Sequence, residues 1–146
     1  MAIQPAYRDA ERTNDSPRSV KIYKDLNLNF SRHPVTKKLN VLTDAAAVKR
    51  SVRNLVQIGQ YEKPFHPEIA SGVRDMLFEN MTPFTAHALQ TKITDVITNF
   101  EPRALLTSVE VLPRFDENQY EVVVEFYIQN APAELIDLSF TLERLR

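Results

Sequence analysis

The chain has 146 residues, of which 43% are hydrophobic and 25% charged, so it is expected to fold as one domain with a hydrophobic core. The formal net charge of −1 provides no basic excess for gripping phosphates, which argues against nucleic-acid binding. The absence of cysteine excludes disulfides and thiolate-held zinc, and no stretch approaches the ~18 consecutive apolar residues of a membrane helix.

The composition changes along the chain and predicts an N-terminal arm with an extended segment at residues 1–42, followed by a single domain at residues 43–146. Residues 1–19 are polar and have neither a helical nor a strand period, so we expect them to stay flexible until a partner binds. Next, Leu26, Leu28 and Phe30 alternate with polar residues, a pattern typical of a half-buried strand.

Helical spacing begins after Thr43, which suits an N-cap, and continues for three to four turns. The apolar stripe of this predicted helix consists of Ala47, Val48, Val52, Leu55 and Val56. The basic residues Lys49, Arg50 and Arg53 are expected to face away from it.

Two further helices are predicted after an irregular loop at residues 59–67. A short one spans residues 69–80, and a long one begins with Thr82 as N-cap and Pro83 in its first turn. Pro102 ends the long helix, because a residue that precedes proline is disfavoured in helical conformation. Its apolar positions are Leu89, Ile93, Val96 and Phe100.

The C-terminal third has the period of two that is typical of strands, with a polar turn at residues 116–119 and a break at Ala131 and Pro132. The first strand is expected to turn Val109, Val111 and Phe115 inward, the second Tyr120, Val122, Val124, Phe126 and Ile128, and the third Ile136, Leu138, Phe140 and Leu142. These elements predict an α+β fold, in which an extended arm and helices precede and pack on a C-terminal antiparallel sheet.

The sequence offers little for catalysis or for cofactors, and we expect neither a cofactor nor a metal. The three histidines have no metal-ligand spacing, two glycines cannot form a phosphate loop, and no serine has the Gly-x-Ser-x-Gly context. Asp75 and Glu79 could share one helical face as a glycosidase pair. A solvated pair beside Arg74 explains the same spacing, and we favour that interpretation.

Two features indicate partner binding instead. Glu101, Pro102 and Arg103 follow the long helix, either as a helix stop with exposed charges or as a rigid corner that presents arginine to a partner. The last strand carries no proline, inward charge or bulge from Leu135 to Leu142, so its edge could accept further strands.

Three motifs resemble one family in order: Lys-Pro-Phe-His-Pro-Glu at residues 63–68, Arg-Asp-Met-Leu-Phe-Glu-Asn-Met-Thr-Pro at 74–83, and Asn-Phe-Glu-Pro-Arg at 99–103. This is the lysozyme-like baseplate wedge and sheath-initiator family of contractile tailed phages, and the resemblance covers residues 44–146. It implies a structural α+β protein of the virion, made in the host cytoplasm and present in six copies per baseplate. A peptidoglycan-degrading tail lysozyme is the alternative.

The resemblance also implies partners. The corner of Glu101, Pro102 and Arg103 would touch the helical core bundle that joins wedge proteins, and tail tube or hub proteins would lie nearby. The sheet would resemble the attachment domain of the sheath protein. The strand that carries Ile136, Leu138, Phe140 and Leu142 would then accept sheath arms and initiate sheath polymerisation.

Overall fold

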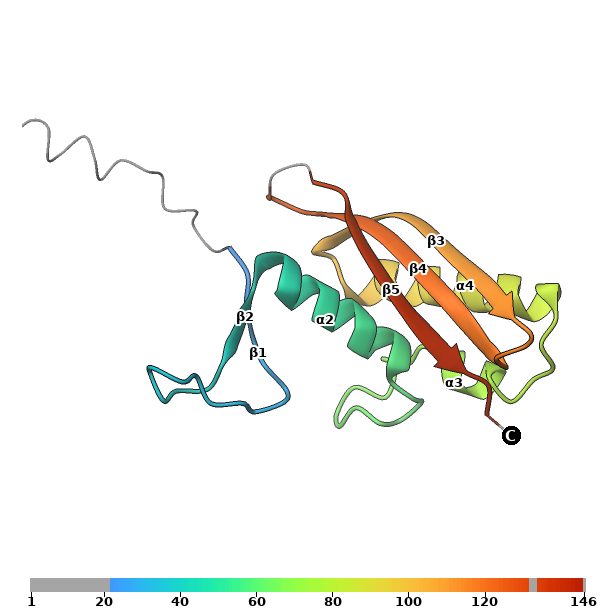
Figure 1. Cartoon of the computed structure of the whole chain (residues 1–146), viewed down its shortest axis with the longest axis horizontal. Coiled ribbons are helices and arrows are strands. Elements are labelled where there is room, and N and C mark those ends of the chain that lie inside the picture. Colours follow the sequence, from blue (N-terminus) through green and yellow to red (C-terminus); the bar gives the residue numbers. More distant parts are fainter. Residues whose placement is uncertain (1–21, 132–133, 146) are drawn as a thin grey trace, which may run out of the picture.

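The computed structural model describes residues 22–131 and 134–145, so the predicted arm at residues 1–19 lies outside the described part of the chain. The elements follow the predicted order of helices before the main sheet (Figure 1). They are β1 (Lys24–Leu26), β2 (Val41–Thr43), α2 (Asp44–Gln57), α3 (Val73–Met76), α4 (Pro83–Phe100), β3 (Ala104–Arg114), β4 (Gln119–Ile128) and β5 (Ile136–Glu143). The α+β class is confirmed, whereas the domain division near residue 43 stays a prediction.

The main sheet is antiparallel, with the strand order β3-β4-β5. One face packs against the helices, and Figure 1 shows the strands lying across α4. The alternation in β4 is confirmed, because Tyr120, Val122, Val124 and Phe126 are fully buried. The expected inward position of Phe115 is wrong, since β3 ends at Arg114 and Phe115 is exposed in the turn.

The helices follow the predicted stripes with three differences. The α4 cap is confirmed, because the Thr82 hydroxyl oxygen accepts the Thr85 backbone N–H at 3.1 Å. The short helix is confined to Val73–Met76, since the chain turns again at once. Leu55 lies only half-buried at the margin of the α2 stripe. Arg53 does not face away, because its guanidinium lies over the Phe140 ring at 5.9 Å.

The strands β1 and β2 form a hairpin (residues 22–43, the β1–β2 hairpin) that projects beyond α2 in Figure 1. The expectation that Leu26, Leu28 and Phe30 are half-buried is wrong, because they are 46%, 51% and 63% exposed. The alternation is present with the opposite phase, and Tyr23 and Asp25 face the body of the protein. Residues that look like a core strand therefore form an outer surface.

Candidate partner-binding site

The chain turns sharply between the long helix and the sheet at residues 101–103, the Glu-Pro-Arg corner. The Glu101 N–H donates to the Ile97 carbonyl and closes the last turn of α4. Pro102 is exposed at the tip, and β3 begins one residue after Arg103. Glu101 itself is only 3% exposed, so the corner carries a buried carboxylate that needs a partner.

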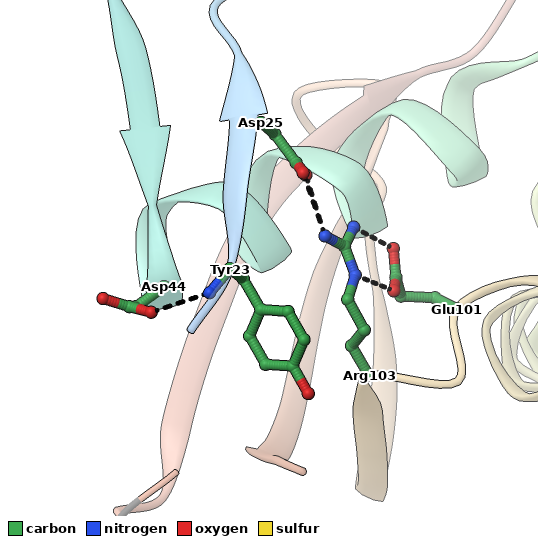
Figure 2. Close-up of polar contacts among 5 residues, drawn as sticks. All are labelled: Tyr23, Asp25, Asp44, Glu101 and Arg103. Carbon is green, nitrogen blue, oxygen red and sulfur yellow. Dashed lines mark hydrogen bonds and ion pairs between the residues drawn. The ribbon is translucent and has the colours of Figure 1, made fainter. Parts of the chain in front are cut away.

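Arg103 is that partner, and it binds a second carboxylate as well (Figure 2). Its Nε donates to Glu101 Oε1 at 2.6 Å and its Nη2 to Glu101 Oε2 at 2.9 Å, a bidentate pair. Its Nη1 donates to both carboxylate oxygens of Asp25 at 3.0 Å. The guanidinium also lies 5.6 Å from the centre of the Tyr23 ring. One arginine thus joins the corner to the β1–β2 hairpin.

Further hydrogen bonds hold the hairpin in place, among them those of Tyr23 and Asp44. The Tyr23 hydroxyl donates to the Gln129 carbonyl at 2.9 Å, just beyond β4. Asp44 Oδ1 accepts the backbone N–H groups of Ile22 and Tyr23 at 2.9 and 3.1 Å. Asp44, the first residue of α2, has a φ of +47°, a conformation that aspartate tolerates better than most residues. In this conformation its side chain lies against β1. The corner and the hairpin therefore form one polar assembly.

The charges of the corner stabilise each other. Burial raises the pKa of Glu101, but hydrogen bonds from Arg103 and Ser51 and the charge of Arg103 outweigh burial and leave this pKa below its ordinary value. The hydrogen bonds and charge of Glu101, and then those of Asp25, raise the pKa of Arg103 above its ordinary range. Both groups are consequently ionised at neutral pH.

This linkage predicts an acid-sensitive contribution to stability. The folded state holds Glu101 deprotonated more strongly than the unfolded chain does, so its contribution is complete above the ordinary pKa of 4.5 and is lost as pH falls through the lowered value. We expect the difference in unfolding free energy between the wild type and Glu101→Gln, measured in urea, to be constant near neutral pH and to shrink in acid. A difference that persisted unchanged in acid would contradict this role.

The corner residues predicted from the sequence do lie together, but their charged groups bind each other and Asp25 of the same chain. Glu101 and Arg103 neutralise each other, and the third member of the cluster, Asp25, comes from a strand 78 residues away. Sequence analysis missed Asp25, Tyr23 and Asp44, because no local pattern marks a contact over that separation. A partner carboxylate would have to compete with Asp25 for the arginine. Contact of the corner with a partner stays a prediction.

The other predicted site residues lie on β5, with their side chains turned toward the core. Ile136, Phe140 and Leu142 are buried and Leu138 is half-buried. They therefore fix the position of the strand, and only its backbone and its other side chains can meet a partner. Their assignment to partner binding stays a prediction.

The ladder bonds determine which backbone groups of β5 are unpaired. The Arg144 N–H donates to the Asn118 carbonyl and continues the unbroken β4–β5 register, so even-numbered residues of β5 point their N–H and C=O groups at β4. The odd-numbered residues point theirs away from the sheet. These are Asp137, Ser139, Thr141 and Glu143.

The two edges of the sheet differ in their ability to accept a strand. On β3 the register shifts between Leu106 and Ser108, and Pro113 removes an N–H from the outer edge. Both features hinder further pairing. The β5 edge has neither over Ile136–Glu143, and no strand among the described residues pairs with it. The β5 edge is therefore the better acceptor of an added strand.

The carboxylate pair proposed as an enzymatic alternative does not form a clear site. Asp75 and Glu79 are both exposed, and Asp75 borders a shallow surface pocket of about 630 Å³ whose lining does not include Glu79. Within residues 22–131 and 134–145, no cluster of three His, Cys, Asp or Glu side chains could hold a metal ion. No helix in those ranges has the length and hydrophobicity of a membrane span.

Two solved structures share this fold. A putative tail lysozyme from Geobacter sulfurreducens has a TM-score of 0.66 at 20% identity, covering 73% of this chain and 97% of the other. A structure of the anti-feeding prophage baseplate matches with a TM-score of 0.58 at 22% identity, covering 85% of this chain and 87% of the matching one. The fold is thus shared with a protein of the anti-feeding prophage baseplate.

The sequence defines the family. A family model described as baseplate wedge protein gp25 matches residues 43–133. The baseplate wedge protein gp25 of Enterobacteria phage T4 is 30% identical over 96 residues, which are 66% of this chain and 73% of the phage protein. The chain belongs to the family of baseplate wedge protein gp25, and the predicted baseplate wedge family is confirmed.

Proposed function

We propose that this chain is the structural component of a contractile phage tail on which sheath polymerisation begins. The observation that carries the proposal is the outer edge of β5, with which no strand of the described residues pairs and at which sheath arms add as strands. Main-chain pairing suits such a role, because it offers a regular row of donors and acceptors to an extended segment. Each added subunit can present an equivalent edge to the next, so one template starts a polymer.

The rest of the proposal concerns attachment to the baseplate. The Glu-Pro-Arg corner docks on the helical core bundle of the wedge, and tail tube or hub proteins lie close by. The chain is present in six copies in the virion, is made in the bacterial cytoplasm and needs no cofactor. The corner supports this role because its proline is exposed between α4 and β3, at the tip of a turn whose two charged residues bind each other.

Baseplates assembled without this chain test the function directly. We expect them to form but to polymerise no sheath on addition of sheath protein, and we expect purified chain to restore polymerisation. Electron microscopy counts tails with sheath. Sheath growth at normal frequency from baseplates that lack the chain would refute the proposed role.

A tail lysozyme remains the second candidate function, because the fold resembles that of a putative tail lysozyme. We expect purified protein to leave a suspension of bacterial cell walls turbid, since Asp75 and Glu79 are both exposed to water and Glu79 does not line the pocket that Asp75 borders. Clearing of the walls that Asp75→Asn or Glu79→Gln abolished would establish an enzyme instead. A known lysozyme serves as the positive control.

A further inference from the structure

The β1–β2 hairpin turns its apolar side outward, the reverse of an ordinary surface hairpin. Leu26 pairs with Val41 across the two strands, and the Asn27 N–H donates to the Asn40 carbonyl and extends the ladder toward Leu28 and Leu39. Each of the four apolar residues is about half exposed. Ile22, Phe30 and Val35 are exposed as well. No residue of the described ranges covers this surface, which is typical of a docking element.

The same hairpin is basic on its accessible side. Its exposed charged residues are Lys24, Arg32, Lys37 and Lys38. Its one carboxylate, Asp25, is turned toward the body and bound by Arg103. The complementary partner therefore presents apolar side chains among carboxylates.

This chain carries such a surface itself. The face of the β3-β4-β5 sheet that points away from the helices, here called the open face, bears Glu110, Glu121, Glu125, Asp137 and Glu143. Among the strand residues of that face, Arg114 is the one basic side chain, and Glu121 neutralises it at 2.5 Å. Leu105, Leu112 and Tyr127 are exposed between the acids. The open face thus offers apolar contacts within a negative field.

We propose that the β1–β2 hairpin of one copy docks on the open face of a second copy. The two surfaces are complementary in charge, and both expose apolar side chains. Figure 1 shows the hairpin projecting beyond α2 with its loop pointing away from β3, β4 and β5, so one copy can use both surfaces at once. The contact is head-to-tail, and repetition gives an open chain or a closed ring. It goes beyond the proposed sheath role, because it uses the face of the sheet and leaves the β5 edge free.

Charge reversal on each side tests the contact in the purified full-length protein. Lys24→Glu with Lys38→Glu inverts the hairpin, and Glu110→Lys with Asp137→Lys inverts the open face. All four residues are exposed, and their side chains make no hydrogen bond or ion pair within the described residues, so folding should survive. Sedimentation velocity over a concentration series gives the association constant, and circular dichroism verifies the fold.

We expect the wild type to associate beyond dimers as its concentration rises, and each double variant to associate about 100-fold more weakly. A chain that carries all four changes should associate again, because both signs are inverted together. The proposal would be overturned if the wild type stays monomeric at every concentration. It would also be overturned if the variant with all four substitutions folds correctly and stays dissociated. Association that survives both reversals and disappears with Ser139→Pro would identify pairing of β5 edges instead.

Discussion

Proline at Ser139 is expected to abolish sheath polymerisation while the baseplate still assembles. Ser139 lies in the middle of β5, and its N–H points away from β4, so proline removes no bond within the sheet. It does remove a donor from the outer edge and places a ring where an added strand would run. An added sheath strand would therefore lack hydrogen bonds at the middle of β5. Electron microscopy of baseplates incubated with sheath protein measures the fraction that carry sheath.

Two matched changes make the result specific. Ser139→Ala retains the N–H and is expected to support normal sheath growth. Thr141→Pro alters the next outward N–H along the same edge and should act like Ser139→Pro. Thermal denaturation must show that each proline variant is folded. Normal sheath growth from a folded Ser139→Pro variant would exclude the outer edge of β5 as the template.

Arg103→Ala is expected to destabilise the fold by about 3 kcal/mol, because it leaves the buried Glu101 without a counter-charge and releases Asp25. Urea denaturation measures the loss. Arg114→Ala is the control, since it breaks an arginine–carboxylate pair whose arginine side chain is 56% exposed, and it should cost much less stability than Arg103→Ala. Replacing Arg103 with methionine and Glu101 with leucine removes both charges and should cost less than the single alanine change.

The same variant tests whether Arg103 of the Glu-Pro-Arg corner acts within the chain or at a partner interface; the alternative of a helix stop with exposed charges is wrong, because Glu101 is buried. If the arginine acts mainly within the chain, hydrogen exchange of the β1 and β2 amides should accelerate in Arg103→Ala and in Asp25→Asn, because the hairpin loses its main charged contact. A variant with unchanged stability and exchange that no longer binds wedge proteins would instead assign the arginine to a partner interface.

Most of the fold could be predicted from the sequence, because its elements depend on local features. Thr82 and Pro83 begin α4 through a cap and a fixed backbone angle, which need only neighbouring residues. The alternation in β4 and β5 also determines which side chains are buried, because the helices cover one face of the sheet. The family motifs depend on residue order alone.

Only the tertiary structure decided which face of β1 packs inward and which distant residues contact each other. The alternation around Leu26 predicts two faces of a strand, but it cannot predict that the polar face packs inward, because that depends on the distant Arg103 that binds Asp25. Similarly, the sequence predicts inward side chains in β5 and leaves open which N–H groups remain unpaired. That property follows from the register with β4, and the register is determined only when the two strands meet.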